Sequence, residues 1–165
     1  MVNKTNVQAA HGTANPTSIS IPKLRSKFKD RVIAPGDPDY DKARTVFYGG
    51  VDRHPAVIIK VADANDVSRV INLARESGLE LAVRSGGHSS VGHSVSEGGI
   101  VLDLSNMKDL QIDPESRTAW AEAGLTAREF TTAAAAHGLG VGFGDTGSVG
   151  IGGLTLGGGV GYLVR

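Results

Sequence analysis

The apolar residues of this chain occur in short blocks whose spacing predicts alternating strands and helices. Residues 56–61 (AVIIKV) are almost continuously apolar, which is typical of a strand buried on both faces. A helix is expected between Asp63, a favourable N-cap, and Gly78, a favourable terminator, and further strands are expected at 81–83 and 100–104. The apolar positions on one face of that helix are Val67, Val70, Ile71 and Ala74. A strand, a helix and a strand in such close succession predict a βαβ unit with parallel strands.

The second half of the chain begins with a predicted hairpin and a predicted helix. Residues 111–112 and 118–121 flank the turn sequence 113–116 (DPES), which favours an antiparallel pair. Thr126 and Glu129 match the pattern of a capping box, so a helix is expected to start there and to stop at Gly138. Together these elements indicate an α+β fold in which helices pack on a mixed sheet.

The composition excludes several classes of protein. The chain has 165 residues, of which 17 are basic and 17 acidic, and the absence of net charge argues against a nucleic-acid partner. It has no cysteine, so disulfide scaffolds, thiolate metal sites and thiol catalysis are excluded. The sequence has neither a long apolar run nor a secretory signal, so we expect no membrane association and a cytoplasmic location. Residues 1–29 are basic without any acid, and we expect a flexible leader there, before a domain over residues 30–165.

Glycine accounts for 23 of the 165 residues, about twice its usual share, and it is concentrated in two places. The first is the stretch 84–90 (RSGGHSS), directly after a strand of the predicted βαβ unit. Consecutive glycines let backbone N–H groups converge on an anion, and α/β proteins commonly bind ligands at the carboxyl ends of strands. This loop is therefore a candidate phosphate-binding loop, with a plain Gly-Gly turn as the alternative. Arg84 is either a source of positive charge for that site or a member of a surface ion pair.

The second concentration is residues 138–162, in which 12 of 25 residues are glycine. Because an interior glycine costs about 0.5–1 kcal/mol relative to alanine, we expect no good helix in this segment. Its interspersed apolar residues predict an ordered segment with buried apolar side chains, pressed against something flat or anionic. Gly142, Gly144 and Gly147 match G-x-G-x-x-G, but without a following helix the match does not indicate a dinucleotide-binding Rossmann unit.

Taken in order, these pieces closely resemble the FAD-binding domain of the vanillyl-alcohol-oxidase/PCMH superfamily, specifically the berberine-bridge-enzyme-like oxidases. The resemblance rests on 55–59, Asp66-Val67, 84–89, 101–105 and 149–161, and it covers about residues 30–165. It implies a PCMH-type fold of two α/β subdomains that binds FAD, with the first glycine loop holding the diphosphate through backbone amides. It also implies a covalent bond from His88 to the flavin 8α-methyl group.

His88 has two interpretations from the residues alone, as a neutral, exposed imidazole or as a turn histidine bonded to backbone. His93 is close to it in sequence, but no third ligand accompanies the pair, so no metal site is expected. By the resemblance, Thr146 stands where some relatives carry a cysteine that makes a second bond to the flavin, so a single covalent bond is expected. The residues that the resemblance places at the FAD are His88, Arg84, Ser85, Gly86, Gly87, Ser89, Gly92, Asp145, Thr146, Gly147, Ser148, Gly150, Gly152, Gly153 and Gly158.

The enzymes that the chain resembles carry further strands and a substrate-binding domain after the glycine-rich segment. We therefore expect an incomplete FAD-binding domain without turnover of its own, whether it is a fragment, a short gene product or part of a larger assembly. The resemblance implies oxidation of a small organic substrate, with O2 accepting the electrons and leaving as H2O2. No catalytic base, substrate or oligomeric state is assigned. A non-catalytic FAD- or nucleotide-binding module and a glycine-rich structural domain remain as alternatives.

Overall fold

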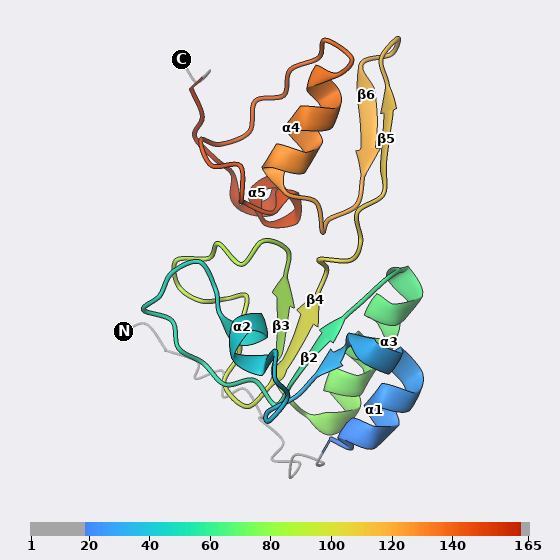
Figure 1. Cartoon of the computed structure of the whole chain (residues 1–165), viewed down its shortest axis with the longest axis vertical. Coiled ribbons are helices and arrows are strands. Elements are labelled where there is room, and N and C mark those ends of the chain that lie inside the picture. Colours follow the sequence, from blue (N-terminus) through green and yellow to red (C-terminus); the bar gives the residue numbers. More distant parts are fainter. Residues whose placement is uncertain (1–18, 163–165) are drawn as a thin grey trace, which may run out of the picture.

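The structure, a computed structural model, describes residues 19–162, which fold into two parts (Figure 1). The first part is built on a four-stranded sheet, and the second contains a two-stranded hairpin and two helices. In the sheet the strand order is β1-β2-β4-β3, with β1 antiparallel to β2 and the other neighbours parallel. The strands of this sheet are β1 (Val32–Ile33), β2 (Val57–Lys60), β3 (Leu81–Arg84) and β4 (Ile100–Asp103). The expected α+β organisation with a mixed sheet is confirmed.

β2 and β3 are parallel, as the predicted βαβ unit requires, but they are not neighbours. β4 lies between them and pairs with both, so that Val101 stands opposite Ile58 on one side and Ala82 on the other. All four residues of β4 are buried, whereas β3 forms the edge of the sheet. The apolar pattern does not predict this strand order, because buried parallel strands of similar composition can be arranged in a sheet in more than one order.

Helix α3 (Ala64–Ser77) begins and ends where its caps predict. The Asp63 carboxylate accepts a hydrogen bond from the Asp66 N–H at 2.8 Å, and Gly78 adopts the left-handed conformation with φ of 67°. Val70 and Ala74 pack in the main core with residues of β2 and β4. The prediction that Ile71 belongs to the buried face is wrong, since it is 40% exposed. The buried face is centred on Val70 and Ala74, and Ile71 lies about 100° round the helix from Val70.

A helix precedes the sheet in the region where the sequence predicts a flexible leader. Helix α1 (Ile21–Phe28) places Leu24 and Phe28 in the same core as α3 and the sheet, and both are buried. The expected flexible leader over residues 1–29 is therefore not seen at residues 21–28, which form a packed helix. Residues 1–18 lie outside the part that the structure describes. The reason is that Leu24 and Phe28 are four residues apart and so lie on one helix face, which packs against the sheet.

Two short elements connect α1 to the rest of the sheet. A 3-10 turn, η1 (Lys29–Arg31), leads into β1, and helix α2 (Tyr40–Arg44) follows it. The buried Tyr40 hydroxyl donates a hydrogen bond to the Pro55 carbonyl at 2.7 Å. This bond ties α2 to the start of β2 and so fixes where the chain runs between them, which matters for the site described below.

The second part begins with the predicted hairpin, β5 (Leu110–Asp113) and β6 (Thr118–Ala121), which pair in antiparallel fashion. Helix α4 (Ala127–Ala135) follows and starts with the predicted capping box. The Thr126 hydroxyl accepts from the Glu129 N–H, and the Glu129 carboxylate accepts from the Thr126 N–H at 2.8 Å. Within residues 19–162, no helix has both the length and the apolar character needed to cross a membrane.

The glycine-rich segment contains a helix that the sequence does not predict. Helix α5 (Ile151–Gly157) starts with buried Ile151, whose N–H donates to the Leu125 carbonyl at 2.9 Å. The expectation of no helix is wrong because tertiary contacts at its first turn override the low propensity of glycine. The expectation of buried apolar side chains holds for Ile151 but is wrong for Leu156, which is 91% exposed, and for Val160, which is also exposed.

The capping box of α4 predicts a loss of stability in acid. The hydrogen bond from Lys108, with those from Thr126, lowers the pKa of Glu129 from 4.5 to about 2. A carboxyl whose pKa is lower in the folded state contributes stability above its unfolded pKa and loses it as the pH falls from about 4.5 to 2. Glu129→Gln should therefore show a smaller fall in unfolding free energy over that range, measured by urea denaturation. Glu115→Gln, in the exposed hairpin turn, is the control and should keep the fall of the unsubstituted chain.

Candidate functional site

The loop that follows β3 presents backbone N–H groups without a protein acceptor. Gly87, buried and with φ of +69°, turns the chain sharply after Arg84. Within residues 19–162, the N–H groups of Gly86, Gly87, His88 and Ser89 donate no hydrogen bond to the protein. Successive backbone donors at the carboxyl end of a parallel strand are a common place for an anion to bind. The phosphate-binding loop stays a prediction from the sequence, and the structure adds that these donors have no acceptor in the described part of the chain.

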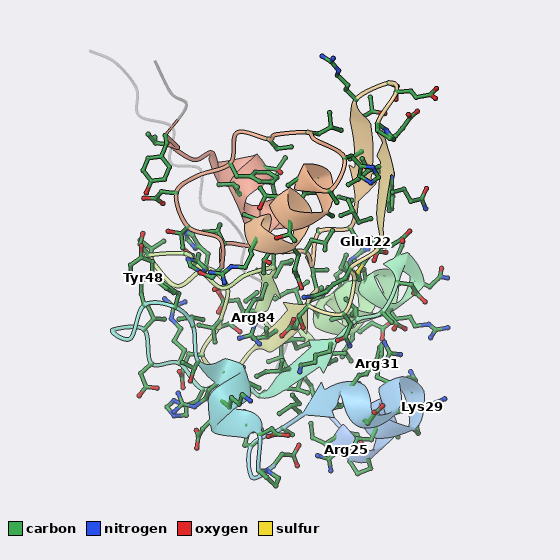
Figure 2. All side chains as sticks on the ribbon, turned by 45° about the horizontal axis from the view of Figure 1, so that its top comes forward. Arg25, Lys29, Arg31, Tyr48, Arg84 and Glu122 are labelled. Atoms are coloured by element: carbon green, nitrogen blue, oxygen red, sulfur yellow. The ribbon has the colours of Figure 1, made fainter. Side chains whose placement is uncertain are left out.

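A buried ion pair lies beneath this loop. Arg84 donates to the Asp103 carboxylate at 2.9 Å, and the two residues are only 6% and 5% exposed. Asp103 also accepts the Ser105 N–H at 2.8 Å, and the Leu104 N–H donates to the Arg84 carbonyl at 2.8 Å. The ion pair expected for Arg84 is present, but the prediction that it lies at the surface is wrong, and a carboxylate balances the charge of Arg84. Its role is to lock the ends of β3 and β4 together, near the centre of the molecule in Figure 2.

The two glycine segments meet at Gly86 and Gly150. A Cβ built on Gly86 would lie closer than 3.0 Å to the Gly150 nitrogen, and one built on Gly150 would lie equally close to the Ser85 Oγ. The Ser85 hydroxyl donates to the Ala123 carbonyl at 2.5 Å, which holds the loop against the turn before α4. Because no side chain fits between them, these backbones are in direct contact. Glycine is required at both positions for packing, independently of any ligand.

His88 lies half-buried with its ring against Phe47. The two ring centroids are 4.1 Å apart and the planes are inclined by 18°, which is a stacked arrangement. Burial lowers the pKa of His88 below its ordinary value, and a hydrogen bond with the Ser148 backbone opposes this effect. The imidazole is therefore favoured in its neutral form near pH 7, as the sequence-based interpretation of a neutral histidine expects. It is not the fully exposed side chain of that interpretation.

A cavity of about 490 Å³ opens beside the loop. Its wall combines the loop itself with the segment around α2, the ends of β2 and β4, and Ser148 from the second part. Lys42 and Lys60 contribute cationic side chains to this wall and Asp39 contributes a carboxylate, while Arg84 and Asp103 neutralise one another. The cavity therefore combines the glycine loop, an imidazole and an excess of one cationic side chain, which favours an anionic ligand with an extended organic part.

The other predicted site residues differ in how close they lie to a cavity or to the first loop. Asp145, Thr146 and Gly147 line a second cavity of about 280 Å³, which they share with α4 and Tyr162. Gly152 packs near the Ala123 carbonyl and the Ser85 hydroxyl, close to the first loop. The remaining three, Gly92, Gly153 and Gly158, line neither cavity.

Sequence reasoning missed Phe47 and Lys60 as part of the wall of the first cavity. Lys60 interrupts an apolar strand run near its end, and a charged side chain at the carboxyl end of a strand is a usable signal. Phe47 lies in an irregular segment far from His88 in sequence, and no periodicity or motif points from one to the other. Only the tertiary structure brings the two rings together.

Comparison with known proteins gives concordant results. Residues 55–165 match the family described as the FAD binding domain. An FAD-linked oxidoreductase of Bacillus subtilis is 40% identical over 136 residues, which is 82% of this chain and 30% of the relative. Berberine bridge enzyme-like 14 of Arabidopsis thaliana is 35% identical over 124 residues, which is 72% of this chain and 24% of the relative. The crystal structure of 6-hydroxy-D-nicotine oxidase from Arthrobacter nicotinovorans superposes with a TM-score of 0.78 at 37% identity, over 80% of this chain and 29% of that one. The chain spans less than a third of each of these proteins.

The contact between the glycine segments yields a matched pair of substitutions. Gly150→Ala should destabilise the fold by about 1–3 kcal/mol, because the methyl group forces apart Gly86 and Ser85. Gly153→Ala, in the interior of α5 with nothing within 4 Å of its new methyl group, should stabilise it by about 0.5–1 kcal/mol. Urea unfolding of both variants measures the two effects. Equal stability of the two variants would show that the close approach of these backbones is not a constraint.

Proposed function

Because the chain belongs to the FAD binding domain family and its relatives are FAD-linked oxidoreductases, we propose that the loop Arg84–Ser89 holds the diphosphate of FAD in this protein. The observation that carries the proposal is the set of N–H groups from Gly86 to Ser89 that donate to nothing within residues 19–162. Of these residues Gly87 is buried and the other three are partly exposed, and a diphosphate supplies several acceptor oxygens to such a set of donors at once. The cavity beside the loop has room for part of an extended ligand such as FAD. Two lysines in its wall can interact with the negative charge of the diphosphate.

The rigidity of the loop supports the same role. The Arg84–Asp103 pair holds it from below, the Ser85–Ala123 hydrogen bond holds it from the side, and Gly150 packs against Gly86. Donors that are fixed before the ligand arrives bind it without a further ordering cost.

The second glycine segment is proposed to contribute further contacts to FAD. Residues 145–148 lead from the second cavity to Gly150, and we assign Asp145, Thr146, Gly147 and Ser148 to the cofactor there. Gly152 belongs with them through its packing near Ser85. Gly92, Gly153 and Gly158 have no contact that supports a role at the cofactor.

His88 is proposed as the covalent ligand of the flavin. A neutral imidazole has a nitrogen lone pair available for bond formation, and burial favours the neutral form of His88 by lowering its pKa. With FAD bound, a ring nitrogen of His88 would form the bond to the flavin 8α carbon, and the imidazole and the methyl group would each give up one hydrogen. The flavin would supply the acceptor for these two hydrogens and their two electrons, and O2 would take them up as H2O2.

The activity of the whole protein is proposed to be oxidation of a small organic substrate. FAD supplies acceptance of a hydride equivalent at its ring, and the role of this chain is to bind and orient it. One structural relative is named as an oxidase, which supports O2 as the electron acceptor. Oxygen consumption by the whole protein, measured with panels of alcohols, sugars and amines, tests this assignment. Turnover with an artificial electron acceptor but none with O2 would identify a dehydrogenase instead.

Substitutions at two glycines with positive φ distinguish an effect on FAD binding from an effect of backbone strain. Gly87→Val and Gly78→Val place the same β-branched side chain at φ of +69° and +67°, and each should cost of the order of 1–3 kcal/mol of stability. FAD affinity should be abolished only in Gly87→Val, because only there does the side chain displace the N–H donors. Titration calorimetry with FAD measures the difference. Unchanged affinity in Gly87→Val would remove the loop from the binding site.

The covalent bond is tested by His88→Ala. The chain with His88 should retain flavin after acid denaturation, seen as an added mass of one FAD, whereas His88→Ala should bind FAD only reversibly. His93→Ala, which replaces an exposed histidine five residues away, is the matched control and should keep the added mass. Acid-stable flavin in His88→Ala would place the attachment elsewhere.

A further inference from the structure

The aromatic ring of Phe47 covers one face of the His88 imidazole, although it belongs to a distant segment of the chain. The ring centroids are 4.1 Å apart with an angle of 18° between the planes. Phe47 is nevertheless 59% exposed, so it does not serve as a core residue. Its ring contacts the adjacent Tyr48 edge-on at 5.2 Å, so the stacked contact with His88 is the one that joins Phe47 to a distant segment.

The backbone around Phe47 is fixed from both sides. The Phe47 N–H donates to the Gly87 carbonyl at 3.1 Å, so the residue is bonded to the same loop that carries His88. On the other side, Val46 is buried in the apolar cluster with Ile58 and Val101. The ring is therefore presented to His88 by an anchored segment, and its position does not depend on its own burial.

Ion pairs hold the same segment further out. Arg44 pairs with Asp41 before the ring and with Asp52 after it, so one guanidinium bridges the two sides of the segment. All three residues are at or near the surface, and the pairs act chiefly to restrain the path of the chain.

His88 itself has few contacts that determine its orientation. Gly87 precedes it with a positive φ, and Ser89 follows it at the start of a turn that the Gly92 N–H closes. The Ser148 backbone contacts the imidazole from the second part, and the Phe47 ring stacks on its face. These two contacts define the plane of the imidazole, and with it the direction of the nitrogen that is to form the bond.

We propose that Phe47 is a positioning residue for His88, which confines the imidazole to one orientation and so accelerates formation of the bond between His88 and the flavin. This inference rests on the proposed covalent attachment. Orientation of a reacting group contributes directly to rate, because only the correctly placed population reacts. A stacked aromatic pair shifts the population of its geometry by about two- to tenfold, and removal of the ring should slow attachment by that factor.

Three variants of the chain separate positioning from general apolar contact. Phe47→Leu keeps an apolar side chain without a ring face, and Phe47→Tyr keeps the ring. Trp120→Leu removes a comparably exposed aromatic residue from β6, outside both cavities, and is the matched control. Each variant is purified without flavin and mixed with FAD, and the fraction with the added covalent mass is followed over time after acid denaturation. Attachment should be about two- to tenfold slower in Phe47→Leu and near the original rate in Phe47→Tyr and Trp120→Leu.

Two further measurements report on positioning without turnover. In the flavin-free chain, the His88 ring protons should show an upfield ring-current shift by NMR that is lost in Phe47→Leu and kept in Phe47→Tyr. In a His88→Ala background, where no bond forms, adding Phe47→Leu should lower reversible FAD affinity by clearly less than it slows attachment in the chain with His88, although Phe47 belongs to the cavity wall. A loss of affinity smaller than the loss of attachment rate means that weaker binding does not account for the slower attachment.

The outcomes distinguish this inference from the proposed function. If the unsubstituted chain forms no acid-stable flavin, covalent attachment fails and this inference fails with it. If that chain forms the adduct but Phe47→Leu forms it equally fast, or Phe47→Tyr is as slow as Phe47→Leu, only the positioning role is overturned. A loss of reversible FAD affinity in Phe47→Leu as large as the loss of attachment rate also overturns it, since Phe47 would then be a structural or binding residue.

Discussion

The contact of two backbones at Gly86 and Gly150 is the constraint on which the site depends. It joins the sheet of the first part to the start of α5 in the second, at a place where a single Cβ would collide with backbone. The isolated bridge between Thr126 and Gly150 extends this contact to the start of α4. The glycine loop after β3 is thereby held between elements that are far apart in sequence. Glycine serves here to let backbones touch, and flexibility is not its purpose.

Charge is used sparingly around this contact. The one arginine of the loop is paired with Asp103, and the cavity wall holds two lysines and one further carboxylate, that of Asp39, so the excess of positive charge there is small. A buried ion pair of this kind contributes little net stability, but it fixes the relative position of two strand ends. Such an arrangement favours a diphosphate, whose oxygens accept several hydrogen bonds, over a ligand that needs one strong countercharge.

The His88 and Phe47 rings are attached to the same loop as the N–H groups that have no acceptor in the described part of the chain. The same loop that offers N–H groups also carries His88, and the N–H of Phe47 bonds to the carbonyl of Gly87 within it. Tyr48, adjacent to Phe47 and edge-on to it at 5.2 Å, lies at the outer rim in Figure 2. The loop N–H groups, the His88 imidazole and the Phe47 ring are thus held by a single structural unit at the cavity.

Much of the local structure was determined by the sequence itself. Asp63 and Gly78 delimit α3, Thr126 and Glu129 start α4, and the glycine loop after β3 is recognisable, because capping and turn formation depend on residues close together in the chain. The tertiary structure alone decided the insertion of β4 between β2 and β3, the formation of α5 despite its glycines, the burial of Arg84 against Asp103, and the stacking of Phe47 on His88. Each of these depends on partners distant in sequence, and local propensity does not encode which partner a strand edge, a charge or a ring will meet.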